Sequence, residues 1–329
     1  IMSLKDNLLA TFPQLNSANE TEVLKDLRKN AIKNFENIGF PTRKEEAWKF
    51  TSLNPVLKED YKILFDESKI DEEKIKSYYV EGADTYKMVF VNGKTHEGLS
   101  TITETEEYAI LPLSVAKQHT DYNALVNKHF GTIAEDSSMA NLNTAMHTDG
   151  LFVYVKRSKV VSKPIELLYF AYADGEAAML QPRNLIIVED NAQVQIIERH
   201  QSLTENPVLT NVVSEIYNSK DALVDWYKIQ ADTEHASLVD GTYFYQEERT
   251  EPSVHTFSLG GRITRNNLEF YQHGERSNSI LKGVTILEGR EHVDHYTKVH
   301  HTQPDCESHQ DYKGIYGGRS NGVFNGKIY

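Results

Sequence analysis

The sequence predicts a mainly β protein that begins with a helical and mixed α/β region. From Ser17 to Ile38 apolar residues recur at helical spacing. Beyond Asp149 the residue pattern changes, and short β-rich runs follow one another at intervals of roughly ten residues. No convincing helix interrupts these runs. We therefore divide the chain into an N-terminal helical and mixed α/β region, residues 1–148, and an all-β block, residues 149–329.

The N-terminal helix is expected to be amphipathic. Its apolar positions are Val23, Leu24, Leu27, Ala31, Ile32, Phe35 and Ile38. Ser17, followed three residues later by Glu20, has the spacing of a capping box. Gly39 and Pro41 should end the helix, because glycine adopts a positive φ at low cost and proline has no N–H to donate.

A small mixed α/β region is expected next. Tyr78–His96 carries an alternating run ahead of Asn92-Gly93, a pair that supplies the two positive φ values of a tight hairpin. The segment Leu113–Phe130 predicts a further helix, with Leu125 and Val126 on its apolar stripe.

The all-β block contains strand signals along its whole length. They are Leu151–Val155, Ile165–Tyr172, Asn184–Val188, Gln193–Ile197, Thr210–Tyr217, Leu223–Ile229, Gly241–Tyr245, Val254–Leu259, Leu268–Gln272, Ile280–Leu287, His292–His301 and Gly322–Tyr329. Turn-forming residues separate them, such as Glu189-Asp190-Asn191, Asp240-Gly241 and Leu287-Glu288-Gly289. No strict repeat is visible, so a propeller or hexapeptide helix is disfavoured. The pattern alone leaves a β-sandwich and a less regular β-helix open.

Bulk properties restrict the partners and the compartment. A net charge of −13, with no Lys/Arg cluster, excludes nucleic acid and an anionic membrane surface as expected partners. No apolar run approaches the roughly 18 residues that a membrane span needs, and no secretion signal is visible. The single cysteine, Cys306, cannot form an internal disulfide. A cytoplasmic location is therefore expected.

The last residues, Val323–Tyr329, stop in the middle of a strand signal. A bare final coil of a β-helix would expose its edge and its core, and such ends are normally capped. We therefore expect a further C-terminal part in the natural protein.

The most specific string in the chain is Gly39–Leu53, which reads GFPTRKEEAWKFTSL. It resembles the N-terminal signature of the SufD members of the SufB/SufD family. Supporting matches are Asp149-Gly150, Pro164-Ile165, Pro182-Arg183-Asn184, Tyr227-Lys228-Ile229-Gln230, Asp294-His295, Thr297, His300, Pro304, Ser308, Tyr312-Lys313-Gly314 and Val323–Ile328. The likeness therefore covers nearly the whole chain.

The resemblance implies a right-handed parallel β-helix core preceded by an N-terminal α-helical and mixed region. It also implies a non-catalytic scaffold subunit of the SUF iron–sulfur cluster assembly complex. Such a subunit pairs with SufB, and the SufC ATPase is recruited through a C-terminal helical segment that would lie beyond Tyr329. No firmly bound cofactor is expected, although iron or a cluster could be held transiently at a subunit interface. The isolated chain could also pair with itself.

The signature segment is expected to be structural rather than chemical. Proline fixes φ, and the charged residues share one helical turn beside aromatic anchors. The residues singled out are Gly39, Pro41, Arg43, Glu45, Glu46, Trp48 and Lys49.

Histidines gather between His292 and His309. In a strand, the even-numbered residues from His292 to His300 share one strongly polar face. Histidine, carboxylate and thiolate are metal ligands, so His292, Asp294, His300, Cys306 and His309 are candidate ligands for iron or zinc. The alternative is that these side chains form an ordinary exposed polar face, and that the cysteine is a small buried hydrophobe.

Two other functions stay open at this point. One is a protein-binding β-helix without a cluster role, and the other is a carbohydrate-active β-helix enzyme. The enzyme would need a compact carboxylate pair beside a basic residue, and none stands out. No P-loop string occurs, and no Ser/His/Asp triad can be argued from residue order.

Overall fold

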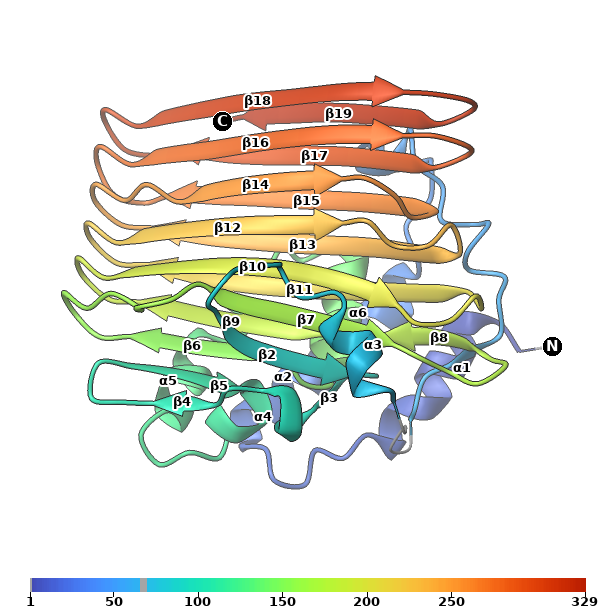
Figure 1. The fold of residues 1–329 in the computed structure, drawn as a ribbon, viewed down its shortest axis with the longest axis horizontal. Coiled ribbons are helices and arrows are strands. Elements are labelled where there is room, and N and C mark those ends of the chain that lie inside the picture. Colours follow the sequence, from blue (N-terminus) through green and yellow to red (C-terminus); the bar gives the residue numbers. More distant parts are fainter. Residues whose placement is uncertain (1, 66–69) are drawn as a thin grey trace.

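Two sheets face each other, and the chain winds between them with one strand of each sheet per coil (Figure 1). The computed structural model describes residues 2–65 and 70–329. Sheet A contains, in spatial order, β19 (Asn321–Ile328), β17 (His292–His301), β15 (Ile263–Gln272), β13 (Ala236–Gln246), β11 (Val208–Asn218), β9 (Arg183–Val188), β6 (Leu151–Val155), β5 (Tyr108–Pro112) and β4 (Thr103–Glu104). At one end of β11, β8 (Ala177–Leu180) joins it to β1 (Tyr61–Lys62).

Sheet B contains β18 (Glu307–Tyr316), β16 (Asn278–Leu287), β14 (Ser253–Ser258), β12 (Leu223–Gln230), β10 (Gln193–Ser202), β7 (Ile165–Ala171), β2 (Tyr86–Val91) and β3 (Lys94–Thr95). Neighbouring strands from β7 onward pair in parallel within both sheets, and the coils wind right-handed (Figure 1). The predicted right-handed parallel β-helix is confirmed, and the parallel pairing excludes the sandwich.

Parallel register places like-facing residues of successive coils on top of one another. In sheet A one inward column consists of Ile216, Phe244, Phe270 and Val299, all fully buried. Its counterpart in sheet B is Ile196, Trp226, Val254 and Leu281. Burying each such side chain is worth about 1.5–3 kcal/mol, so these columns are the main source of stability for the β-helix.

The interior also holds a polar layer beside these columns. Lys228 of β12 reaches across to sheet A, where its Nζ lies 2.6 Å from Asp240 Oδ2 and 2.5 Å from Thr242 Oγ1. Asp240-Gly241 was expected to be a turn, and that prediction is wrong because both residues lie within β13. The Asp240 carboxylate is buried as the partner of the lysine rather than exposed at a loop.

Helices cover the outer face of sheet A. These are α1 (Leu4–Thr11), α2 (Glu22–Ile38) and α6 (Ser138–Met146), whose apolar side chains pack with outward residues of the sheet such as Leu209 and Val239. The remaining helices are short: α3 (Glu72–Lys76), α4 (Leu113–Ala116), α5 (Asn123–His129), and the 3-10 turns η1 (Phe12–Gln14), η2 (Glu46–Trp48) and η3 (Glu97–Leu99). No helix in the described ranges has both the length and the apolarity to cross a bilayer.

The long N-terminal helix is confirmed, but its start is not where the capping box placed it. The N-cap is Thr21, whose hydroxyl accepts the Leu24 N–H, and the helix ends at Gly39 with φ +74°. Ser17 and Glu20 do not form the box, because the Glu20 carboxylate is engaged in buried ion pairs with Arg28 and Lys117.

The predicted hairpin is confirmed, since Asn92 and Gly93 have φ values of 48° and 76° between β2 and β3. The single helix expected over Leu113–Phe130 is instead two short helices, α4 and α5. Between them the His119 ring accepts the Asp121 N–H, a side-chain bond that competes with helical pairing.

Every predicted run of the β block coincides with a strand, and β8 and β18 were not predicted. The strands β2 to β5 extend both sheets below β7 and β6, so the two predicted regions share their sheets. The boundary at residue 149 stays a prediction.

Candidate functional site

The signature segment, Gly39–Leu53, contacts the outer face of sheet A at β15, β17 and β19. In Figure 1 this part of the chain is the blue trace that rises along the right-hand side of the β-helix. Trp48 is buried against β15, Thr51 bonds to β17, and Glu46 lies 2.9 Å from Lys327 of β19. The segment therefore connects three successive coils that are far from it in sequence.

Arg265 is the centre of this contact. Its guanidinium carbon lies 4.3 Å from the Trp48 ring centroid and 4.6 Å from that of Tyr296, so the cation is held between two aromatic faces. Its Nη1 donates to Asp294 Oδ2 at 2.7 Å, and the Thr51 hydroxyl donates to the same oxygen. Both charged side chains are almost fully buried. Burial lowers the pKa of Arg265, and the neighbouring carboxylate opposes that shift.

His292 belongs to the same group of contacts, which we call the signature network: Trp48, Thr51, Arg265, His292, Asp294 and Tyr296. The His292 Nε2 lies 2.8 Å from the Thr51 hydroxyl oxygen. Burial lowers the pKa of His292, with Asp294 opposing and Arg265 reinforcing the shift. The ring is therefore held neutral near pH 7.

The other candidate ligands lie elsewhere. His300, on the outer face of sheet A, has its Nε2 2.6 Å from Glu269 Oε1 and stacks between the rings of Tyr271 and Tyr329. Cys306 lies in the turn between β17 and β18, where its thiol is 3.4 Å from the Gly274 carbonyl oxygen.

His309 is an exposed residue of β18 on sheet B and pairs with Glu307 at 3.3 Å. The predicted sharing of one face by the even residues of β17 is confirmed, since His295 and Val299 face the interior while His292 and His300 face outward. The five candidates nevertheless lie on sheet A, in a turn and on sheet B. One centre built from all five is incompatible with this fold, and metal binding by a subset stays a prediction.

In the described part of the chain, a different trio has ligand atoms within 4.8 Å of one another: Glu104, His119 and Asp121. The His119 Nδ1 accepts the Asp121 N–H, so the proton lies on Nε2, which faces Glu104 at 3.2 Å. The ring thus uses both nitrogens in hydrogen bonds, one with the Asp121 backbone and one with the Glu104 carboxylate. Sequence reasoning missed it because nothing in its spacing distinguishes it.

The signature network joins the signature segment to the histidine-rich segment that begins at His292, two features that the sequence showed separately. The structural role of the signature residues stays a prediction. Within the segment, Arg43 Nε donates to the Lys49 carbonyl, and the Glu45 carboxylate accepts the Thr42 N–H. No sequence signal pointed to Arg265, because a lone arginine in a strand is normally exposed. The network fixes the position and orientation of the signature segment on sheet A, since most of its polar atoms already have partners within the protein.

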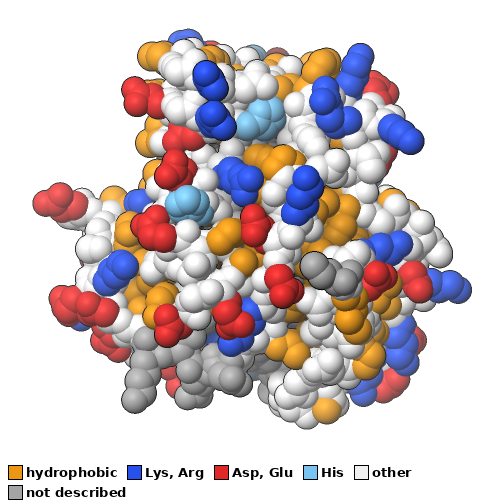
Figure 2. All heavy atoms as spheres, turned by 90° about the vertical axis from the view of Figure 1, so that its right-hand side faces the viewer, with side chains coloured by type: hydrophobic (Ala, Val, Ile, Leu, Met, Phe, Trp, Pro, Cys, Tyr) orange, Lys and Arg blue, Asp and Glu red, His pale blue; other side chains and the backbone are white. Residues whose placement is uncertain are grey.

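The side of the β-helix beside this segment carries charges of both signs (Figure 2). Figure 2 shows Lys and Arg side chains interspersed with Asp and Glu over that face, with apolar side chains between them. Such a mixed surface suits a protein partner better than a polyanion.

Comparison with known proteins decides the family. Residues 170–329 match the family described as SUF system FeS cluster assembly, SufBD core domain, and residues 6–167 match the SufBD protein N-terminal region. The chain belongs to the SufBD family. Its two matched parts meet between residues 167 and 170, and together they span almost the entire sequence.

Relatives agree with this assignment at low identity. An iron–sulfur cluster assembly SufBD family protein of Synechocystis is 27% identical over 321 residues, which is 95% of this chain and 70% of the relative. The iron–sulfur cluster assembly proteins SufD of Escherichia coli and Bacillus subtilis are each 23% identical, over 88% and 99% of this chain. The chain spans 66% and 75% of the lengths of those two SufD proteins.

Proposed function

We propose that this SufBD family protein is a SufD-like, non-catalytic scaffold subunit of an iron–sulfur cluster assembly complex. It pairs with a SufB-like scaffold and acts with a SufC-like ATPase. The observation that carries the proposal is the match to proteins named SufD over 88% and 99% of the chain. Relatives named as SufBD family proteins rather than SufD match between 68% and 95% of it. The proposal of the SufD branch therefore rests on these two SufD relatives together with the signature string Gly39–Leu53.

The fold supports a role as a rigid scaffold. Sheets A and B are joined across the interior by Lys228 with Asp240, and by Gln230 with Asn266 at 2.6 Å. His295 of sheet A continues this chain to Thr285 of sheet B at 3.0 Å. Buried, satisfied polar pairs of this kind resist sliding of one sheet over the other.

ATP-driven motion of a SufC-like partner would then change how two stiff scaffolds meet, opening or closing a cluster-building site between them. Iron or a cluster is cargo at that interface rather than a resident cofactor of this chain. The chain supplies geometry, and ATP hydrolysis belongs to the partner. We place the complex in the cytoplasm, without a nucleic acid or membrane partner, and the isolated chain can form a homodimer through the same surface.

The test is co-expression of the full-length protein with its SufB-like and SufC-like partners. A tag on this protein should recover both partners in fixed stoichiometry, whereas a tag on an unrelated β-helix protein should recover neither. Recovery of this protein alone would contradict the proposal and favour a binding module with other partners.

A further inference from the structure

A second region with unusual chemistry lies on the N-terminal side of the β-helix, away from the signature network. A cavity of about 550 Å³ opens between the Gln14–Glu20 loop, the segment after β1, the β2–β3 hairpin and α4. This volume lies within the range of pockets that hold small molecules. Seven apolar side chains line its walls: Leu15, Ile63, Leu64, Phe65, Ile102, Pro112 and Val115.

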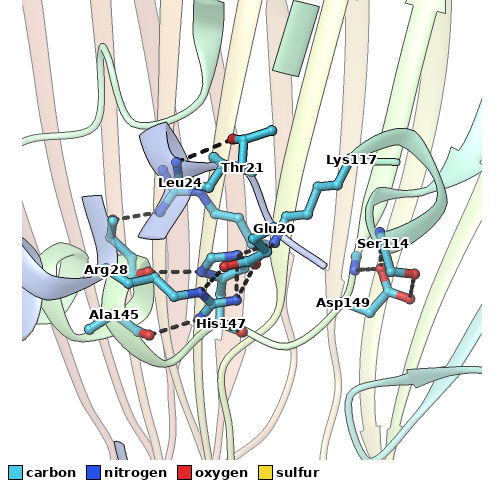
Figure 3. A network of polar contacts seen from close by, with 12 residues as sticks. Glu20, Thr21, Leu24, Arg28, Ser114, Lys117, Ala145, His147 and Asp149 are labelled. Atoms are coloured by element: carbon cyan, nitrogen blue, oxygen red, sulfur yellow. Dashed lines mark hydrogen bonds and ion pairs between the residues drawn. The ribbon is translucent and has the colours of Figure 1, made fainter. Parts of the chain in front are cut away.

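The floor of the cavity is a buried ionic cluster, shown in Figure 3. Arg28 binds the Glu20 carboxylate with two nitrogens, Nε and Nη2, each at 2.8 Å. Lys117 Nζ lies 2.6 Å from the same carboxylate and 2.6 Å from His147 Nε2. These four side chains are nine-tenths buried or more.

The His147 ring in this cluster is neutral. Its Nδ1 donates to the Thr144 carbonyl at 2.8 Å, so the Nε2 lone pair accepts from Lys117 and Arg28. Burial and the two neighbouring cations lower the pKa of His147 well below its ordinary value. Two cations therefore share the single carboxylate of Glu20, which leaves one positive charge in excess at the floor.

The two cations differ in how far their donors are used. Arg28 has its remaining donors on the carbonyl oxygens of Ala145 and His147, at 2.8 and 3.0 Å. An ammonium has three N–H bonds, and Lys117 directs two of them to Glu20 and His147. The centroid of the Phe130 ring lies 5.7 Å from Nζ, which makes this ring a weak partner. Lys117 is thus the residue that can still bind an anion.

Asp149, on another part of the cavity wall, does not neutralise this charge by contact. Its carboxylate accepts from the Ser114 N–H and hydroxyl, the Thr95 hydroxyl and the Gly150 N–H. Figure 3 shows this group beside the Lys117 cluster and separate from it. The carboxylate joins the hairpin to α4 and so forms part of the cavity wall.

We infer that this cavity binds a small carboxylate carrying an apolar chain, with its carboxylate on Lys117 and its chain along the apolar wall. An anion there would accept the third N–H of the ammonium and compensate the excess buried charge. A neutral molecule of the same shape would bury the same apolar area without that bond. The charge-assisted bond is therefore the source of selectivity.

The pH dependence of binding follows from the groups that face Lys117, namely Glu20, Arg28, His147 and Asp149. Burial and Arg28 lower the pKa of Lys117 to about 8, against the opposing carboxylates. A carboxylate binds the protonated amine. Between pH 7 and pH 9 the protonated fraction falls about tenfold, and the affinity should fall with it, with proton uptake near pH 8.

The test uses hexanoate and the neutral analogue hexanamide, titrated calorimetrically into the full-length protein at pH 7 and pH 9. Hexanoate should bind at pH 7 at least tenfold more tightly than hexanamide and lose about tenfold at pH 9. The Lys117→Met variant should lose this preference. Lys94→Met, which removes an exposed lysine from the mouth of the same cavity, should retain it.

Three outcomes would overturn the inference. They are equal binding of hexanoate and hexanamide, absence of hexanoate binding at millimolar concentration, and unchanged hexanoate binding by Lys117→Met. The wild-type preference for hexanoate over hexanamide at pH 7 decides the inference even where the Lys117 variant fails to fold, since equal affinities would show that no cation of the cavity binds the carboxylate.

Discussion

The two outer faces of the β-helix differ sharply. The outer face of sheet A is covered by α1, α2, α6 and the signature segment, and it holds buried charges such as Arg265 with Asp294 and Arg183 with Glu215. The upper part of sheet B, from β14 to β18, instead exposes apolar side chains to solvent. Phe257 is 38% exposed, Val284 40% and Ile315 68%.

This difference indicates that the covered face of sheet A, the interior and the bare face of sheet B contribute unequally to stability. Both sheets contribute apolar columns to the interior, and these columns do not depend on what covers the outer faces. The cover on sheet A adds specific ion pairs that need correct placement of a distant segment. Substitutions on sheet A should therefore cost most, interior substitutions less, and substitutions on the bare face of sheet B least.

The largest effect is expected for Arg265→Met. This change leaves the buried Asp294 carboxylate without its cation, and breaking a buried pair typically costs about 3–5 kcal/mol. The free energy of unfolding from urea denaturation measures the loss. The matched control is Arg262→Met, because Arg262 is half-buried and its contact with Glu59 is 3.9 Å long. The control should change stability by less than about 0.5 kcal/mol. A loss for Arg265→Met as small as that for the control would show that the signature network does not stabilise the fold.

An intermediate effect is expected from His295, which is buried in the interior and bonded to Asn266 and Thr285. Burial lowers its pKa to about 4 in the folded protein, against about 6.5 when unfolded. Between these values the unfolded state binds the extra proton, so stability falls as the pH falls from 6.5 to 4, by up to about 3 kcal/mol.

The His295→Gln variant should lose that part of the acid sensitivity, as measured by urea denaturation at pH 7 and pH 5. His309→Gln, which changes an exposed histidine of β18, should retain the wild-type dependence on pH. If the unfolding free energy of both variants falls with pH as it does in the wild type, the His295 ring is not the source of the acid sensitivity.

The smallest effect is expected on the bare face of sheet B. Val284→Thr replaces an exposed residue by one of the same shape and should change the unfolding free energy by less than about 0.5 kcal/mol. Val254→Thr makes the same replacement at a fully buried interior position and should cost about 1–3 kcal/mol, because it buries a hydroxyl. Thermal denaturation of the two variants side by side checks the difference. A large loss at Val284 would mean that this face is covered in solution.

Much of the β-helix was predictable because inward and outward residues alternate. The strand β12 shows why: Val224, Trp226, Lys228 and Gln230 face inward, and the residues between them face outward. The unpredicted strand β18 has Ser308, Gln310 and Tyr312 at inward positions, so it lacks an apolar signal. The β-helix was distinguished from a sandwich by family resemblance, since strand spacing does not show whether neighbours run parallel.

The contacts across the chain were not predictable from local pattern. The helix α6 was missed because it is buried on nearly every side, and its Asn143 donates to the carbonyls of Pro182 and Asn211. The candidate ligands were adjacent in sequence, yet a single turn carries His309 to the opposite sheet from His300. Conversely, Trp48 and Arg265 are distant in sequence and meet face to face.

The central claim is that this protein contributes scaffold geometry to cluster assembly by its partners. The most direct measurement is the iron and acid-labile sulfide content of SufB-like and SufC-like partners purified anaerobically from cells with and without the full-length protein. We predict that cluster content depends on its presence in a stoichiometric complex. Equal cluster content on the partners when this protein is omitted would contradict the account.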